Sequence, residues 1–379
     1  MERKLLAMAV LAGLSGVAVA NDTNVTLYGI VDGGVSYTNK AAQSGGGTGS
    51  LLGYETNGES PSIFGFKGTE DLGGGLKANF DLEGHFLTST GIGEQWGGLF
   101  GRQANVGLSS SAGKLSLGTM YSPAILAYAA TDPRGLKESY SGLMTWAFST
   151  YGLFAGSAPL VPGTTPSSNS VLDIFLKNAI SGGTSFGPVD VTLAYAFGGV
   201  AGSTQANRVI SLGAVYTGPV TISLAYQSEN GDPTTALPNA TGMANEKVSI
   251  GGAYTMDAFT FKLNYLDNKG KNPSTGNEVS HYKIIGAGVD YKVSDVDSVT
   301  LAYYNGKNSD GTDDKANSLI LSNDYSLSKR TTFYGLIATV KSGTGVSFGS
   351  SAYNGDNFNA PPVSNTNSMA FELGLKHTF

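Results

Sequence analysis

The sequence predicts an all-β fold, namely a transmembrane antiparallel β-barrel. Three observations support this prediction. Apolar and polar residues alternate in segments of about ten residues, the length that a tilted strand needs to cross a bilayer. Tyrosines stand at both ends of the apolar rows, and short turns alternate with longer polar loops along the chain.

The first twenty residues have the pattern of an export signal. Arg3 and Lys4 precede an apolar stretch from Leu5 to Leu14, and Ala18, Val19 and Ala20 form a small-x-small cleavage site. The apolar stretch is too short to cross ~30 Å of hydrocarbon, which disfavours the alternative of a membrane anchor. We therefore expect a cleaved signal peptide over 1–20 and a single barrel domain over 21–379.

The composition agrees with a large sheet of many strands. The 379 residues include 54 glycines and 19 tyrosines but no cysteine, so disulfides cannot supply the stability. The formal charge of -6 becomes -7 when Glu2, Arg3 and Lys4 are removed together, which makes nucleic acid an improbable partner. The sequence indicates no cofactor and no metal.

Alternation is clearest between 189 and 265. Val189, Val191, Leu193, Tyr195 and Phe197 form one apolar face, and the following segments repeat this pattern. One set of tyrosines stands before short turns and the other before longer polar loops, as in the two aromatic girdles of an outer-membrane barrel. These are Tyr216, Tyr254, Tyr291 and Tyr325 in the first set and Tyr195, Tyr226, Tyr265 and Tyr303 in the second.

The pattern predicts sixteen strands, an even number that places both termini on the periplasmic side. We expect them to begin near Val25, Ser62, Leu76, Leu99, Lys114, Asn169, Val189, Arg208, Val220, Lys247, Phe259, Tyr282, Ser298, Asn317, Thr331 and Ser368.

The last strand ends on an aromatic residue. Phe371, Leu373, Leu375, His377 and Phe379 alternate outward. A terminal Phe379 at the end of such a strand resembles the signal that barrel-assembly machinery reads, and an ordinary amphipathic edge strand is the alternative.

Several stretches resemble the general porins of beta-proteobacteria and Neisseria. They lie at 25–32, 64–73, 102–108, 325–331 and 374–379, so that together they span the mature chain. The resemblance implies a homotrimer of sixteen-stranded barrels in the outer membrane, each with a long third loop folded into the lumen. It also implies a water-filled channel for passive diffusion of ions and small hydrophilic solutes.

The segment from Ser122 to about Ser168 is too long for an ordinary connection. Together with Tyr121 directly before it, it has five aromatic residues up to Phe148, which is too many for a disordered segment. We expect it to pack inside the barrel with its charged cluster facing the constriction. The cluster consists of Asp132, Arg134, Lys137 and Glu138.

Inward residues determine what crosses such a channel. The alternation in the 76–86 segment directs every second side chain into the barrel. The neighbouring predicted strand contributes a further candidate, Lys67. The predicted pore-lining residues from this wall are Lys67, Lys77, Asp81, Glu83 and His85. Further inward candidates are Glu229, Lys247, Lys262, Asn264, Glu372 and Lys376.

The sequence departs from the resembled family in its arginines. Ile63 and Thr119 stand where arginine is usual, and the arginine before the sixth strand is missing around 167–169. Of the arginines usual in that family, only Arg102 is present in its expected motif. Counting by twos from the outward Ala104 would, however, place the Arg102 side chain on the outer face. Because fewer fixed charges weaken the field in a pore, we expect weak ion selectivity or a preference for an uncharged or amphiphilic solute.

Three alternatives remain. An outer-membrane enzyme would need a base beside a nucleophile, and His85, His281 and His377 fall in separate strands without one. An adhesin could use the Gly-, Ser- and Asn-rich loops at Thr38 to Pro61 and Gly343 to Asn367. A substrate-specific channel of the same fold is favoured modestly by the missing arginines.

Overall fold

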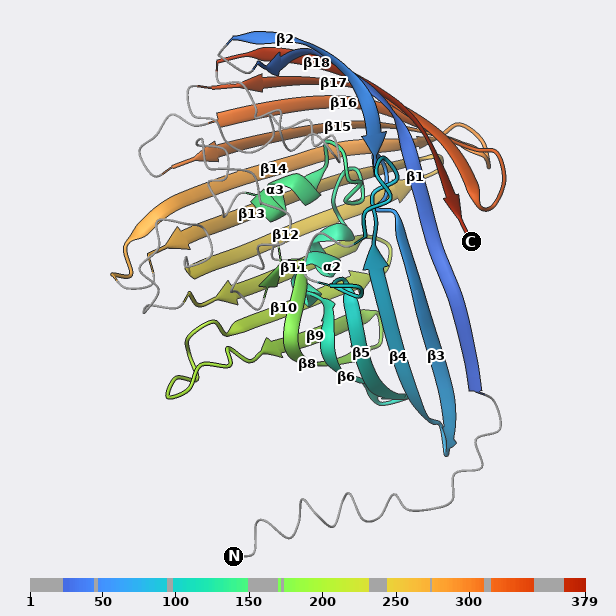
Figure 1. Cartoon of the computed structure of the whole chain (residues 1–379), viewed down its shortest axis with the longest axis vertical. Helices are drawn as coiled ribbons and strands as arrows, with labels where there is room; N and C mark the ends of the chain where they lie inside the picture. Colours follow the sequence, from blue (N-terminus) through green and yellow to red (C-terminus); the bar gives the residue numbers. More distant parts are fainter. Residues whose placement is uncertain are drawn as a thin grey trace, which may run out of the picture.

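The chain forms one antiparallel sheet that closes on itself (Figure 1). The computed structural model describes residues 23–43, 47–93, 98–148, 170–171, 174–231, 244–272, 275–309, 315–343 and 365–379. The predicted signal peptide over 1–20 lies outside these residues. Closure comes from pairing of the first and last strands, with Ile30 opposite Thr378 and Thr38 opposite Ala370. A closed sheet leaves no unpaired strand edge, which a membrane-spanning sheet requires.

The strands follow one another around the wall in chain order. Their bounds are β1 Thr23–Ala42, β2 Thr48–Thr56, β3 Ile63–Gly73, β4 Leu76–His85, β5 Gln103–Ser110, β6 Gly113–Tyr121, β7 Ser170–Val171, β8 Phe175–Phe186, β9 Val189–Ala196, β10 Val209–Thr217, β11 Thr221–Glu229, β12 Ala244–Met256, β13 Phe259–Lys271, β14 Glu278–Lys292, β15 Asp297–Asn308, β16 Lys315–Ser326, β17 Thr331–Ser342 and β18 Asn367–Thr378.

These eighteen strands make a wall of sixteen. β2 and β3 pair with the second and first halves of β1, so they are two parts of one wall strand with a break at 57–62. β7 has two residues and pairs back onto the start of β8, so it adds no strand to the wall. The predicted number of sixteen is confirmed.

Several predicted boundaries on this wall were wrong, and the strand predicted from Tyr282 begins four residues earlier, at Glu278. The segment from Thr38 to Pro61 is not one loop, because β1 continues to Ala42 and β2 lies within the remainder. Its Gly- and Ser-rich composition concealed an alternation in which Leu52 and Tyr54 are exposed. The strand predicted from Leu99 begins at Gln103, and the strand predicted from Asn169 has its main part in β8.

Side chains alternate between an apolar outer face and a polar inner face. Along β18, Phe371, Leu373 and Leu375 are exposed, whereas Glu372 between them is 3% exposed. Such an exposed apolar row carries a hydrophobic penalty in water and none in the bilayer that the sequence pattern predicts. The chain end is held by the backbone, since Gly29 and Phe379 exchange two hydrogen bonds of 3.1 and 3.0 Å.

The two ends of the barrel differ in their connections. Short turns join β3 to β4, β5 to β6, β8 to β9, β10 to β11, β12 to β13, β14 to β15 and β16 to β17. The connections at the opposite end are longer, and the longest joins β6 to β8. Tyr254, Tyr291 and Tyr325 are exposed near the short-turn end, and Tyr303 is exposed near the other.

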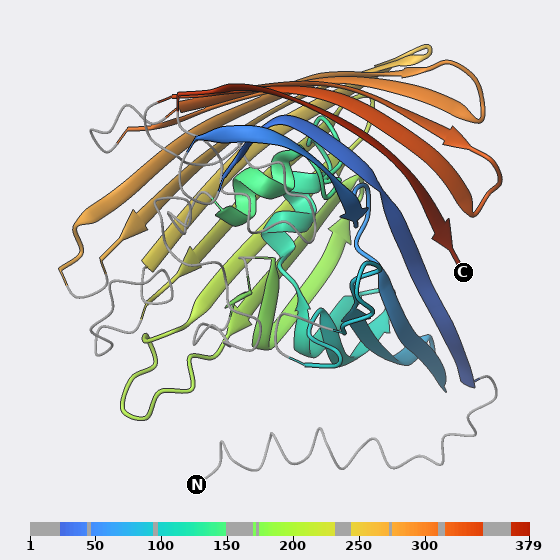
Figure 2. The same cartoon turned by 45° about the horizontal axis from the view of Figure 1, so that its top comes forward.

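Two short helices follow β6. α2 spans Pro123–Ala129 and α3 spans Gly142–Phe148, and both views draw them within the outline of the sheet (Figures 1 and 2). α2 packs against β10 and β11. Among the described residues, no helix is long and apolar enough to span a membrane.

Candidate functional site

The inner faces of β1, β3 and β4 place several of the predicted pore residues together. Lys67 and Asp81 are direct cross-strand neighbours. The Tyr28 hydroxyl donates to Asp81 at 2.7 Å and to Glu83 at 3.1 Å. Lys77 lies farther along β4 toward the short turn and is exposed. The tyrosine therefore ties two neighbouring carboxylates of one strand into a fixed group.

His85 lies at the other end of β4 and is 6% exposed. Its Nε2 lies 2.7 Å from Asn57 Nδ2, in the break between β2 and β3. The structure therefore places His85 with the break in the wall rather than with Asp81. Among the described residues, no three His, Asp or Glu side chains are arranged to hold a metal ion.

Arg102 is buried and joins the inner group. It precedes β5, so the alternation that would turn it outward does not apply at this position. Its Nε donates to Glu83 at 2.7 Å, and its guanidinium also donates to the Tyr121 hydroxyl. The guanidinium carbon lies 4.9 Å from the ring centroid of Phe175. The carboxylate of Glu83 thus neutralises the single arginine retained in the family motif.

The segment after β6 is fastened to the opposite side of the sheet by hydroxyl groups. Ser122 Oγ lies 2.8 Å from Ser211 Oγ of β10 and also bonds Gln227 of β11. Thr131 Oγ1 lies 2.7 Å from Ser223 Oγ, also on β11. These partners are all buried away from water. Because water cannot replace a missing partner there, each of these hydrogen bonds would be costly to leave unmade.

Small residues on the wall make room for this segment. A side chain added at Gly213 on β10 would collide with the backbone oxygen of Pro123. One added at Gly288 on β14 would lie 2.8 Å from Pro133 Cβ, closer than side-chain carbons approach. The absence of side chains at Gly213 and Gly288 is therefore part of how the loop segment fits against the sheet.

Asp132 acts as the internal anchor of the loop segment. Its carboxylate accepts hydrogen bonds from the backbone N–H groups of Arg134, Leu136 and Gly142 at 3.0, 2.9 and 3.1 Å. The Tyr304 hydroxyl of β15 donates to it at 3.1 Å. Burial raises the pKa of Asp132 above its usual range, because the charged form loses its hydration. Asp132 is thus fully occupied in holding the loop.

Arg134 is also turned into the loop. It is 5% exposed, and its guanidinium donates to the backbone oxygens of Ser139 and Tyr140, the latter at 3.2 Å. The predicted loop cluster has four residues. Two of them, Asp132 and Arg134, therefore hold the loop together and do not lie on an open surface.

Lys137 connects the loop to the broken wall strand. Its ammonium lies 2.6 Å from Glu59 in the break and also pairs with Asp324 of β16. Lys376 of β18 lies 2.7 Å from the second oxygen of Glu59. A backbone hydrogen bond reinforces the contact, because the N–H of Glu138 donates to the backbone carbonyl oxygen of Glu59 at 3.2 Å. Glu59 therefore bridges two lysines that come from distant parts of the chain.

Glu138 lies partly buried between the loop and the wall. Burial raises its pKa to about 7, although the nearby charge of Arg102 acts in the opposite direction. The Glu138 carboxyl therefore changes charge near neutral pH beside the arginine.

Sequence reasoning missed three residues of this site. Glu59 was assigned to an ordinary loop, and only the break within a strand places it on the wall. Asp324 and Tyr28 could have been found, because each lies on the inward parity of its strand. The positions Ile63 and Thr119 carry no charge, and Ile63 is 6% exposed in the wall. The third departure, at 167–169, lies outside the described residues.

Known proteins resemble this chain in sequence or in architecture. The sequence profile of a family described as Gram-negative porin matches residues 7–345. The chain is 32% identical over 356 residues to outer membrane porin protein 32 of Delftia acidovorans, with 90% of each chain covered. It is 34% identical over 122 residues to the major outer membrane protein P.IB of Neisseria meningitidis serogroup B, with 32% of this chain and 34% of that protein covered.

A solved structure gives the same picture. The anion-selective porin from Comamonas acidovorans superimposes with a TM-score of 0.74 at 26% identity, covering 94% of this chain and 100% of that one. The OmpT outer membrane protein of Vibrio cholerae shares the fold alone, with a TM-score of 0.59 at 13% identity over 95% of this chain and 99% of that one.

Proposed function

Because this chain belongs to the Gram-negative porin family, we propose that its third loop narrows a passive channel in which paired charges leave little ion selectivity. The protein is an outer-membrane porin, a transmembrane β-barrel with the function of a passive diffusion channel. The observation that carries the proposal is the pairing of Arg102 with Glu83 and of Lys137 with Glu59.

The pairing of lysine and arginine side chains with carboxylates decides the ion selectivity, because a passing ion responds to the summed electric field of all charges on the wall. A cation held 2.7 Å from a carboxylate presents a dipole to the pore rather than a charge, and its field declines steeply with distance. Ile63 and Thr119 add no charge to compensate. The Comamonas relative is described as anion-selective, and we propose that this chain has lost most of that preference.

The third loop sets the width of the channel in this proposal. The bonds of Ser122 and Thr131 to β10 and β11, together with the Lys137 contacts at the opposite wall, support a segment that crosses the lumen. Since the chain has no cysteine, a disulfide between Thr131→Cys and Ser223→Cys tests this directly. We expect the pair to cross-link under oxidising conditions with the conductance retained. Failure to cross-link in a folded barrel would contradict the placement.

Export and assembly follow the family in this proposal. Residues 1–20 are removed as a signal peptide, the short-turn end faces the periplasm, and the barrel-assembly machinery reads the strand that ends at Phe379. Three copies assemble into a homotrimer, as in the trimer form of OmpT from Vibrio cholerae. Outer-membrane lipid surrounds the remaining outer face.

The competing functions have less support. The family and the structural relatives are channels, and we propose no enzymatic activity for this chain. A substrate-specific channel of the same fold is the second candidate, because a polar pocket on the wall has residues suited to holding a solute. An adhesin function has no observation in its favour beyond loop composition.

Single-channel recording of the purified protein in a planar bilayer tests the proposal. We expect stepwise conductance in groups of three and an unheated gel sample that migrates as a folded barrel. Single steps of independent size would contradict the trimer, and the absence of conductance from a heat-modifiable protein would contradict the channel.

A further inference from the structure

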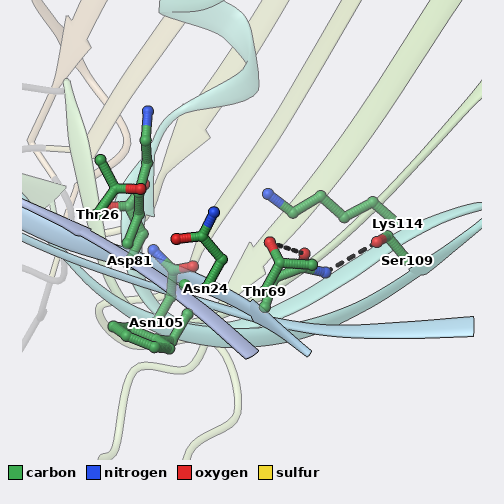
Figure 3. A pocket seen from close by; sticks show the side chains of 11 residues that line it. Asn24, Thr26, Thr69, Asp81, Asn105, Ser109 and Lys114 are labelled. Carbon is green, nitrogen blue, oxygen red and sulfur yellow. Dashed lines mark hydrogen bonds between the residues drawn. The ribbon is translucent and has the colours of Figure 1, made fainter. Parts of the chain in front are cut away.

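A pocket of about 330 Å³ opens on the inner wall near the short turns of β3 to β4 and β5 to β6. It lies on β1, β3, β4, β5 and β6, apart from the loop contacts described above. Its lining includes Asn24, Thr26, Lys67, Asp81, Ser109 and Lys114. Figure 3 shows Lys114 and Asn24 extending from separate strands on the same side of the wall. A volume of this size is enough for a small organic solute.

The two lysines of this pocket differ from those beside the third loop. Within the described part of the chain, no carboxylate lies at ion-pair distance from Lys67 or Lys114, and the Asp81 carboxylate attracts both lysines only from farther away. The Lys67 ammonium lies over the Tyr28 ring, 4.8 Å from its centroid. Asp81 is the only acidic residue in the lining, and it accepts the Tyr28 hydroxyl. The lining therefore carries one positive charge in excess.

A row of hydrogen bonds fixes the floor of the pocket (Figure 3). Thr69 Oγ1 donates to Asn79 Oδ1 at 3.3 Å, and Asn79 Nδ2 donates to Ser109 Oγ at 2.8 Å. Because Ser109 accepts in this row, its own hydroxyl proton stays available to a solute. The side chains of Asn24 and Thr26 make no hydrogen bond to other described residues, so they add further donors. Two ammonium groups and several neutral donors thus line one pocket.

We propose that this pocket is a binding subsite for small hydroxylated organic anions, of which a sugar phosphate is the type. The lysine ammonium groups bind the anionic end by charge-assisted hydrogen bonds. Ser109 and Thr26 donate to it, and Asp81 accepts from a hydroxyl of the solute. A cationic solute is disfavoured by the excess positive charge, and a neutral sugar leaves both ammonium groups without an anionic partner.

This inference rests on the proposed channel function, and one experiment separates the two. Glucose 6-phosphate is added to the full mature protein in a planar bilayer, and the open-channel current is recorded as its concentration rises. We expect a saturable reduction of the current. A conducting channel without saturable block would overturn the subsite and leave the channel intact, whereas no conductance would refute the channel itself.

Variants test the assignment of residues. The double variant Lys67→Gln with Lys114→Gln is expected to raise the half-blocking concentration about tenfold or more, as the loss of charge-assisted bonds predicts. Lys262→Gln is the control, because it removes a lumen lysine from β13, which is paired with Asp290 at 2.9 Å. An equal loss of block in Lys262→Gln would show that the general field, and not the pocket, holds the anion.

Two further solutes test the chemical class. We expect glucose to give no block and inorganic phosphate to give a weaker block than glucose 6-phosphate, because it lacks the sugar hydroxyls. Equal block by inorganic phosphate would overturn the assignment to hydroxylated anions.

Discussion

Two groups of lysines on the inner wall have opposite surroundings. Lys137 and Lys376 beside the third loop share the buried carboxylate of Glu59. Lys67 and Lys114 near the short turns share only the more distant carboxylate of Asp81, and in the described chain neither is at ion-pair distance from a carboxylate. The number of cations in a sequence therefore does not give the field in a pore. Pairing decides whether a lysine stabilises the fold or is available to a solute.

The largest effect is expected from Glu59→Gln. This change removes the shared partner of Lys137 and Lys376, whose side chains are only 18% and 22% exposed. Breaking a buried ion pair by removing one partner costs ~3–5 kcal/mol, and the pair that Lys137 keeps with Asp324 should hold the loss near the lower end of that range. The temperature at which the folded band disappears on a gel should therefore decrease, and the open-channel current should become noisier as the loop loosens. An unchanged transition temperature would show that the pairing is not structural.

A second comparison concerns the pair of Arg102 and Glu83. Glu83→Gln leaves the guanidinium unneutralised and should shift the reversal potential toward anion preference by a several-fold change in the permeability ratio. Arg102→Gln should shift it toward cations by leaving the carboxylate alone. Reversal potentials in a salt gradient measure both. If the reversal potential shifted in the same direction in both variants, Arg102 and Glu83 would not be neutralising each other.

Acidification should act through Glu138. Its pKa of about 7 in the folded protein lies above its ordinary value of 4.5, so the folded state binds the proton more tightly than the unfolded state. Its contribution to stability is therefore greatest below about pH 4.5 and is lost as the pH rises through about 7. Protonation also removes a negative charge near Arg102, which should increase anion preference between pH 8 and 6. Glu138→Gln should reduce this pH dependence, and an unchanged pH dependence in that variant would contradict the assignment to Glu138.

The smallest effect is expected from Lys292→Ala. Its ammonium lies 2.7 Å from Asp295 in a short turn, but the two side chains are 62% and 93% exposed. Exposed ion pairs are screened by water and salt. We expect no measurable change in the gel transition or in the reversal potential, so this variant serves as the control for the three above. A clear change in either readout would show that the short turns influence the pore.

The sequence predicted the wall well and the site unevenly. Alternation with a period of two is a local property, so strands such as β9 to β18 and the outward row of Phe371, Leu373 and Leu375 could be located directly. The family resemblance is confirmed by the profile match. The break at 57–62 could not be found, because a strand interrupted by polar residues has the pattern of a loop.

Contacts between segments far apart in the chain could not be predicted from the alternation of residues. Whether Asp132 faces a pore or binds its own backbone depends on the path of the loop, which no periodicity encodes. Arg102 shows the same limit, since its direction depends on a strand start four residues later than expected, at Gln103 instead of Leu99. Its prediction as a pore residue still needs a functional test.

The most direct test of the account is the reversal potential of the unmodified channel in a tenfold salt gradient near pH 8. Because the cations nearest the third loop are neutralised by carboxylates, the account predicts a value close to zero. A large anion-selective potential would contradict it, by showing that Arg102 and the lysines act on passing ions despite their partners.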